Sequence, residues 1–284
     1  MDGDIWSDWL NGRRFGGDDA VRATVAAETA RFVAKLLDVV ALEPGAALLD
    51  LGCGTGLVGL AALTRQPSLR VTFCDVSAPL LAQAEAAVSA AECRFVLATA
   101  TELRGVADAS QHVVAARAVL AYVDDRAAAF GEIFRVLKPG GWLSVAEPVW
   151  HDEAVAVAAM RAMLSNAPNP ALARRVAWKQ AQLPESSPLA NYTERDLLML
   201  TRLAGFGEVH VRLEIDVEPA PPMGWATFCA LSPHPYAPTL AEILTREFTP
   251  EEQAALEAEL RPAVEAGTNM RTQRVAYVWA RKPA

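Results

Sequence analysis

Short apolar runs and amphipathic segments alternate through the middle of the chain. The runs lie at residues 47–51, 70–76, 93–98, 112–119 and 142–148, and three helical segments separate some of them, at 56–66, 78–91 and 126–137. Apolar strands that alternate with helices of this length indicate βαβ units and a parallel sheet covered on both faces. The letters "KPGG" at 138–141 are expected to stop the third helix, with glycine as its C-cap.

The flanking regions have a different pattern. Residues 1–43 are expected to form two amphipathic helices, the second capped by Asp18 or Asp19. Thr193 and Thr249 are expected to cap two later helices, each with acidic residues in its first turn. Two late strands, at 207–217 and 273–282, are joined by a long helical excursion, which suggests one antiparallel partner at the edge of the sheet.

Composition narrows the classes of function. The formal net charge is -8 and the sequence pI is about 5.1, which argues against nucleic-acid binding because phosphate contacts need clustered Lys and Arg. The four cysteines form no CxxC pair, so we expect reduced thiols, no metal site and a cytoplasmic protein. The first ten residues are acidic where a targeting segment would be basic, and no apolar run approaches the ~18 residues that a membrane span needs.

A glycine-rich turn follows the first apolar run. Gly52, Gly54 and Gly56 come directly after "LLDL", and ligands of open α/β sheets bind outside the carboxyl ends of the strands. The same stretch also satisfies the dinucleotide pattern GxGxxG, with Asp75 at the end of the next strand, so an NAD(P) site competes. Asp50 weighs against it, because a carboxylate before the turn would repel a pyrophosphate and suits an ammonium or sulfonium ligand. No hydride-transfer constellation stands out downstream.

Several stretches of the sequence resemble motifs of the class I S-adenosylmethionine-dependent methyltransferases. "LLDLGCGTG", "FCDVS" and "RVLKPGGWLSVAEP" are similar to their motifs, and the pattern around the fourth strand resembles their small-molecule, ubiquinone/menaquinone-type branch. The resemblance implies a doubly wound, mostly parallel seven-stranded sheet with a Rossmann-like methyltransferase fold and helical lid insertions. It also implies S-adenosyl-L-methionine as cofactor and S-adenosyl-L-homocysteine as product.

The resemblance assigns cofactor contacts residue by residue. Asp50 and the backbone of Gly52, Cys53, Gly54 and Gly56 would face the methionine amino end. Asp75 would bind the ribose hydroxyls and Val76 would flank the adenine. Thr99 stands where the family usually has an aspartate for the adenine amino group, and the backbone of Ala100 follows it. Arg117 would lie at the methionine portion or meet a carboxylate of cofactor or substrate, and Arg13 or Arg14 would reach the methionine carboxylate from a lid.

The resemblance also suggests how the chain is organised. We interpret residues 1–284 as a single methyltransferase domain. Its parts are an N-terminal helical lid at 1–43, a cofactor-binding half at 44–148, a helical cap at 149–190, and C-terminal strands at 191–284 with a helical insertion at 225–267. A monomer or homodimer is expected.

The sequence says least about the methyl acceptor, the molecule that would receive the methyl group. His151, Tyr122 and Glu147 follow strand ends and are candidate catalytic residues, although Glu147 is as well explained by pairing with Arg117. The leading hypothesis is methyl transfer to a small, partly apolar metabolite, at an oxygen, nitrogen, carbon or sulfur atom. Methylation of a peptide or protein side chain, cofactor binding without catalysis, and an NAD(P) oxidoreductase are the alternatives.

Overall fold

The computed structural model describes residues 4–89, 92–164, 166–184 and 186–284. Its contacts divide the chain into two compact units. The helical unit comprises Met1–Ala26, Trp150–Asn191 and Ile215–Gln273, and the sheet unit comprises Ala27–Val149, Tyr192–Glu214 and Arg274–Ala284. Each unit is therefore assembled from three separate segments of the sequence.

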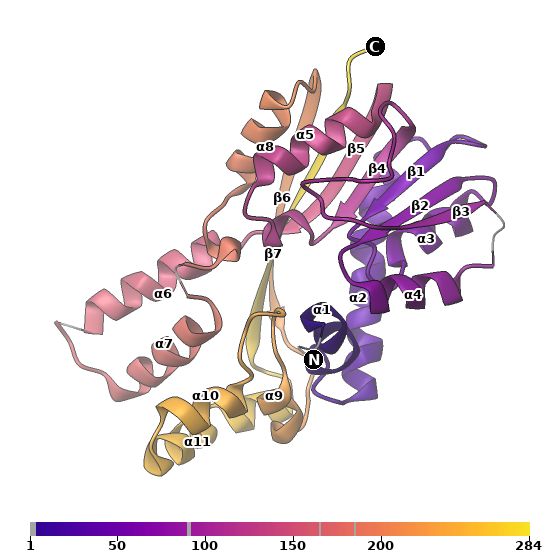
Figure 1. Ribbon diagram of the computed structural model, residues 1–284. Coiled ribbons are helices and arrows are strands. Elements are labelled where there is room, and N and C mark those ends of the chain that lie inside the picture. Colours follow the sequence, from indigo (N-terminus) through magenta and orange to yellow (C-terminus); the bar gives the residue numbers. More distant parts are fainter. Residues whose placement is uncertain (1–3, 90–91, 165, 185) are drawn as a thin grey trace. The chain divides into compact units, whose positions relative to one another are not determined.

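The sheet has seven strands in the order β3-β2-β1-β4-β5-β7-β6 (Figure 1). The strands are β1 (Ala47–Leu51), β2 (Arg70–Asp75), β3 (Cys93–Leu97), β4 (Gln111–Arg117), β5 (Leu137–Pro148), β6 (Glu208–Pro219) and β7 (Met270–Arg281). The pairs that join β1 to β5 are parallel, and β7 is antiparallel to β5. The predicted doubly wound, mostly parallel sheet is confirmed. The antiparallel strand is not at the edge, however, because β7 lies between β5 and β6.

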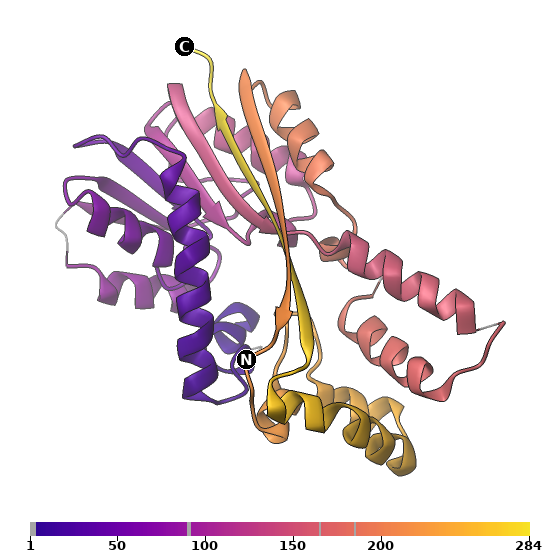
Figure 2. The same ribbon diagram turned by 180° about the vertical axis from the view of Figure 1, so that it is seen from behind.

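Helices cover both faces of this sheet (Figures 1 and 2). One face carries α2 (Asp19–Asp38), α3 (Leu57–Arg65) and α4 (Ala78–Ala87), and the other carries α5 (Arg126–Val136) and α8 (Glu194–Leu203). A short turn, η2 (Leu120–Tyr122), follows β4. The helical unit contains α1 (Ile5–Asp8), η1 (Trp9–Arg13), α6 (His151–Leu164), α7 (Pro170–Gln182), η3 (Pro188–Ala190), α9 (Trp225–Ala230), α10 (Leu240–Glu247) and α11 (Pro250–Ala266).

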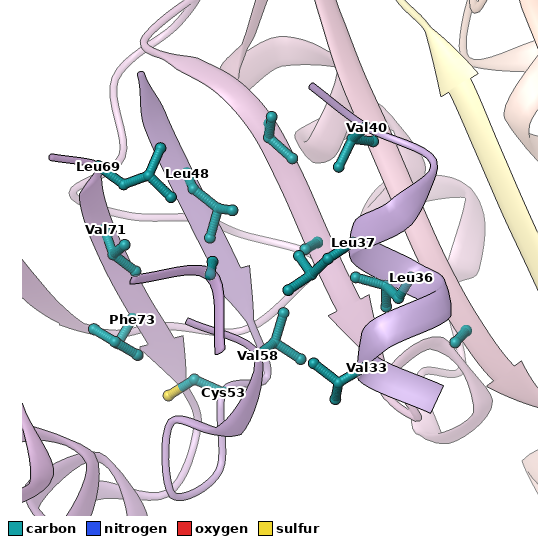
Figure 3. Close-up of a cluster of buried hydrophobic side chains, with 14 of the residues drawn as sticks. Val33, Leu36, Leu37, Val40, Leu48, Cys53, Val58, Leu69, Val71 and Phe73 are labelled. Carbon is teal, nitrogen blue, oxygen red and sulfur yellow. The ribbon is translucent and has the colours of Figure 1, made fainter. Parts of the chain in front are cut away.

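A dense apolar core fixes α2 and α3 against the sheet (Figure 3). Leu36 and Leu37 of α2 meet Leu48 of β1 and the neighbouring side chains of β2, and Leu36, Leu48 and Phe73 are 0% exposed. The strand β1 is buried along its whole length, as expected for a central parallel strand covered on both faces. This rigid base holds the carboxyl ends of the strands in place.

The predicted helix starts are confirmed. Asp18 caps α2, because its Oδ1 accepts hydrogen bonds from the N–H groups of Ala20 and Val21 at 2.8 and 3.2 Å. Thr193 and Thr249 each form a capping box at the start of α8 and α11. These short-range signals are reliable because both partners lie within one turn of the chain.

Two helix ends differ from the prediction. The helix α5 ends at Val136, and Leu137 is already extended, so "KPGG" lies within β5 and supplies no glycine cap. The proline at 139 explains this, since the residue before a proline avoids the helical region. The helix expected at 78–91 ends at Ala87, with Val88 extended, and residues 90–91 lie outside the described residues. In the part of the chain that is described, no helix is long and apolar enough to cross a bilayer.

The packing of α3 predicts a sharp difference between two glycines. A Cβ at Gly59 would lie 2.3 Å from Cε1 of Phe73, whereas a Cβ at Gly131 of α5 would meet nothing within 4 Å. Gly59→Ala should lower the free energy of unfolding by about 1–3 kcal/mol through overpacking. Gly131→Ala should raise it by up to about 1 kcal/mol. Urea denaturation measures both, and equal midpoints for the two variants would contradict the tight packing of α3.

Candidate functional site

The turn after β1 approaches the loop after β4 too closely for any side chain. Gly52 has φ +62°, and a Cβ there would lie 2.3 Å from Cγ2 of Val119. Gly56 has φ +88° and begins α3, so both positions favour glycine for conformational reasons as well. The turn therefore presents bare backbone at the point where the strand order reverses between β1 and β4.

A buried carboxylate lies beneath this turn. Asp50 is 1% exposed, and its Oδ2 accepts a hydrogen bond from the N–H of Gly59 at 2.7 Å. Its Oδ1 is enclosed and has no hydrogen-bond partner among the described residues. Burial raises the pKa of Asp50 from 3.8 to about 7, and the charge of Asp75 adds to the effect. Because Oδ1 is enclosed, the negative charge of Asp50 acts on the turn by its field and not by direct contact.

Asp75 joins the ends of β1 and β2. Its Oδ2 accepts the N–H of Gly54 at 2.7 Å, and its Oδ1 accepts the N–H of Ser77 at 2.8 Å. Val76 follows and is 48% exposed, which leaves an apolar surface beside the carboxylate. The ribose contact of Asp75 and the adenine contact of Val76 stay predictions.

Three other residues that were predicted to contact the cofactor lie in ordinary local surroundings. Cys53 is buried, and its N–H donates to the carbonyl of Cys74 at 3.0 Å, so it helps to fix the turn. Thr99 is exposed after β3, with its hydroxyl 3.1 Å from that of Thr101, while Ala100 is buried. The Thr99 hydroxyl is therefore presented at the surface near the end of β3.

Glu147 holds the loop after β4. It is 0% exposed, and its carboxylate accepts the N–H groups of Val119 at 3.0 and 3.1 Å and of Ala121 at 3.0 Å. The expected ion pair with Arg117 is not formed between these two described residues. Both oxygens of Glu147 are enclosed and bonded to backbone, and its catalytic role stays a prediction. Burial raises the pKa of Glu147 to about 7.

Sequence reasoning missed the second support of this loop. Arg126 is buried, and its guanidinium donates to the carbonyls of Leu120 at 2.9 Å and Ala121 at 3.4 Å. It also lies 4.3 Å from the ring centroid of Tyr192, whose hydroxyl donates to the carbonyl of Pro148. An arginine in the first turn of a helix gives no sequence signal for such a role, because it is usually exposed. The loop that carries Tyr122 is thus held through both its N–H and its carbonyl groups.

Three predicted residues belong to the helical unit. Arg13 donates to Glu242 at 2.8 Å and to the carbonyl of Ala237, so it ties the N-terminal segment to the start of α10. Arg14 lies over the rings of Trp9 and Phe15, at 5.1 and 5.7 Å from their centroids. These contacts give Arg13 a structural role, and the expected cofactor contact of Arg14 stays a prediction.

His151 is the first residue of α6. Its Nδ1 is 3.0 Å from the carbonyl oxygen of Ala190, so Nδ1 carries the proton in this bond and Nε2 is left as an acceptor. This tautomer suits a general base. Its role as a base nevertheless stays a prediction.

The sheet order, the glycine turn and the acidic end of β2 define a Rossmann-like α/β domain of the methyltransferase type. A family model described as "Methyltransferase domain" matches residues 49–145. Trans-aconitate 2-methyltransferase from Enterobacter sp. (strain 638) is 34% identical over 154 residues, which are 54% of this chain and 54% of that protein. The chain therefore spans about half the length of the curated relatives it matches.

Solved structures have the same fold at low identity. A methyltransferase chain from Haloferax volcanii, in complex with the Trm112 activator, has a TM-score of 0.57 and 19% identity, with 100% of both chains covered. Phosphoethanolamine N-methyltransferase 2 from Haemonchus contortus, in complex with S-adenosylhomocysteine, has a TM-score of 0.51 and 17% identity, covering 99% of this chain and 57% of that one. Residues 49–145 of this chain therefore form a domain of the class I S-adenosylmethionine-dependent methyltransferase type, and the solved structures share its fold.

The buried Asp50 predicts a pH-dependent stability. Its pKa is raised in the folded state, so between about pH 4 and pH 7 the folded chain binds more protons than the unfolded chain, and stability falls as the pH rises. Asp50→Asn should remove this decrease in stability with rising pH. The difference in free energy of unfolding between the variant and wild type should therefore shift in favour of the variant by about 1–3 kcal/mol between pH 5 and pH 8.

Urea denaturation at several pH values measures this difference. Asp38→Asn is the control, because Asp38 is an exposed carboxylate paired with Arg65 at 2.7 Å. A constant difference between wild type and Asp50→Asn across this pH range would show that the Asp50 carboxyl does not titrate there.

Proposed function

We propose that this protein transfers the methyl group of S-adenosyl-L-methionine to a small, partly apolar metabolite. The proposal rests on the hydrogen bond that connects the ends of β1 and β2. In it Asp75 accepts the N–H of Gly54, and the exposed Val76 follows Asp75 in the chain. This arrangement offers hydroxyl-binding and ring-binding groups to a nucleoside. The enclosed charge of Asp50 beneath the turn disfavours a pyrophosphate and favours a cation.

The residues present fit this cofactor. In this proposal Asp75, which ends β2 and accepts the N–H of Gly54, binds the ribose, and the exposed Val76 flanks the adenine. Asp50 supplies negative potential for the amino and sulfonium groups. When bound, the cofactor supplies a methyl group that is already activated on a sulfonium sulfur. The protein therefore has to bind, align and desolvate the partners.

Alignment is the main contribution of the chain's own residues. Glu147 and Arg126 hold the loop 118–122 from opposite sides, which fixes Tyr122 and keeps Val119 against Gly52. Positioning of two reactants contributes on the order of 7–11 kcal/mol in favourable intramolecular models. His151 is proposed as the base for an acceptor that must lose a proton, through its Nε2.

The names of the relatives suggest the first acceptors to test. Several of the curated relatives are trans-aconitate 2-methyltransferases, so small unsaturated carboxylic acids are the first acceptors to test. Transfer of a labelled methyl group from S-adenosylmethionine to one of these acids, with release of S-adenosylhomocysteine, is the expected result. Binding of NAD(P)H in place of S-adenosylhomocysteine in calorimetry would contradict the proposed function.

Asp75 provides the first test of the cofactor assignment. Asp75→Ala should weaken S-adenosylhomocysteine binding at least tenfold, because charge-assisted hydrogen bonds to two hydroxyls are lost. Ser77→Ala is the matched control, since Ser77 shares the start of α4 but offers no carboxylate. Calorimetry measures both affinities, and an Asp75→Ala affinity equal to that of Ser77→Ala would refute the ribose contact.

His151 provides the test of the base. His151→Ala should lower kcat by roughly 10²–10⁴-fold and leave cofactor affinity unchanged, because a base acts on the acceptor. His210→Ala, at an exposed histidine that pairs with Glu208, is the control. Steady-state kinetics would exclude His151 as the base if the variant kept full turnover.

A further inference from the structure

A groove of about 750 Å³ lies within the helical unit. It is lined by the end of η1, the end of α7, the loop 231–239 and α10. Three of the lining residues, Ala181, Ala237 and Ala241, carry only a methyl group, which leaves room between these segments. A volume of this size accommodates a small molecule. The groove is thus a candidate site to which the strand ends of the sheet unit contribute no lining residue.

The ring of Tyr236 forms part of the groove wall and is 51% exposed. Every other Trp, Tyr and Phe in the described part of the chain is buried or half-buried. The neighbours of Tyr236 differ from it, since His234 and Ala237 are buried. Trp6 packs against the Tyr236 ring edge to face, with the ring centroids 5.8 Å apart. The loop therefore presents one aromatic ring to solvent at the groove while the residues around it are buried.

Hydrogen bonds from two other segments hold this loop in place. Nε1–H of Trp9 donates to the carbonyl of Ser232 at 2.9 Å, and the N–H of Ser232 donates to the carbonyl of Arg13 at 2.8 Å. Nε2 of His234 donates to the carbonyl of Gln182, the last residue of α7, at 2.8 Å. Three prolines restrict the same loop further. Because the exposed ring is already fixed, a ligand that stacks on it loses little affinity to ordering of the loop.

The charged groups of the groove are two arginines and one glutamate, in a chain whose formal net charge is -8. Glu242 is already engaged, because it accepts the N–H of Thr239 at 2.7 Å and pairs with Arg13 at 2.8 Å. Arg246 is exposed and reaches Glu247, the next residue, at 3.4 Å. An exposed pair of this kind contributes little. Arg246 is therefore the cation of the groove that an anionic group of a ligand can meet.

These groups favour one class of ligand. A flat unsaturated or aromatic body can stack on Tyr236, and a carboxylate matches the planar fork of Arg246. The excess of positive charge disfavours a cation. A phosphate dianion meets stronger repulsion from Glu242, whose carboxylate lies close enough to Arg246 to feel its charge.

We propose that this groove binds a planar carboxylic acid, which stacks on Tyr236 and pairs with the guanidinium of Arg246. The lining residues belong to the helical unit and lie outside the residues that the family model matches. The site therefore does not depend on the methyltransferase function proposed above. Such an acid has two possible sources, a methyl acceptor or a separate effector, and the last measurement below distinguishes them.

Two variants remove the two recognition groups separately. Tyr236→Leu removes the ring and keeps an apolar side chain, whereas Tyr236→Phe keeps the ring. Arg246→Met removes the fork and keeps an apolar stem. Arg195→Met is its matched control, because Arg195 is also exposed and also pairs with its chain neighbour, Glu194, at 3.7 Å, but lies in the sheet unit. Circular dichroism and thermal unfolding establish that all four variants fold.

Calorimetry with 2-naphthoate as the probe tests the site. Wild type is expected to bind it with a Kd below about 1 mM. Tyr236→Leu and Arg246→Met should each weaken binding about fivefold or more, while Tyr236→Phe and Arg195→Met bind as wild type. The uncharged 2-naphthamide should bind more weakly and be insensitive to Arg246→Met. No binding of 2-naphthoate to wild type, or binding that neither variant weakens, overturns the proposal.

A direct readout locates the probe. In protein labelled at the alanine methyl groups, the NMR resonances of Ala181, Ala237 and Ala241 should shift on titration with 2-naphthoate. Those of Ala115 and Ala116, which are buried in β4 of the sheet unit, should not move. Binding that leaves the three groove alanines unshifted overturns the assignment to the groove.

Steady-state kinetics distinguish the two sources of the acid. If the groove takes the methyl acceptor, the KM of a methylated acid such as trans-aconitate rises about fivefold or more in Tyr236→Leu and Arg246→Met, with kcat largely retained. If the acid is a separate effector, this KM is unchanged in both variants. A wild-type protein that transfers no methyl group refutes the function proposed above, whereas the calorimetry and the alanine shifts still decide whether the groove is a site.

Discussion

The close approach of Gly52 to Val119 is the constraint on which the site depends. Two loops from adjacent strands meet where the strand order reverses, and there is no space between them for a Cβ. One loop is fixed by its own glycine geometry. The other is fixed by Glu147, which takes its N–H groups, and by Arg126, which binds its carbonyls. Because both loops are held, the ends of β1 and β4 keep one fixed spacing.

The electrostatic potential at the carboxyl ends of the strands depends on which groups donate hydrogen bonds to the carboxylates there. Asp50, Asp75 and Glu147 are all buried, and each accepts backbone N–H groups from the turns and loops that form the site. Backbone donors fix the geometry of a carboxylate but leave its net charge uncompensated. The edge is therefore negative and selects ligands with cationic groups. Burial raises the pKa of Asp50 and of Glu147 to about 7; the charge of Asp75 adds to the effect at Asp50, and the charge of Arg117 opposes it at Glu147.

The parts of the fold that the sequence predicted are those with local causes. Strand and helix periodicity, the Thr193 and Thr249 caps and the glycine turn all depend on residues within a few positions of one another. The end of α5 was misjudged because Pro139 imposes an extended residue before it, which outweighs the glycine signal. The position of β7 inside the sheet depends on pairing across more than 120 residues, as between Trp142 and Arg281, and no local pattern encodes it.

The residues of the candidate site also fall into two groups, those that local motifs predict and those whose role depends on tertiary contacts. Asp50 and Asp75 were predicted because motifs mark them, whereas the role of Arg126 and the backbone partners of Glu147 depend on tertiary contacts. The enclosed state of Asp50 Oδ1 is also invisible in a motif, since it depends on how α3 packs over β1.

The family match covers only one of the two units of the chain. The matched residues, 49–145, lie wholly within the sheet unit and contain the predicted contacts to the nucleoside. The helical unit is assembled from three segments far apart in sequence, through contacts such as that of Arg13 with Glu242. None of these segments lies within the matched residues. Because the match carries no information about the helical unit, relatives that share the matched residues need not share an acceptor.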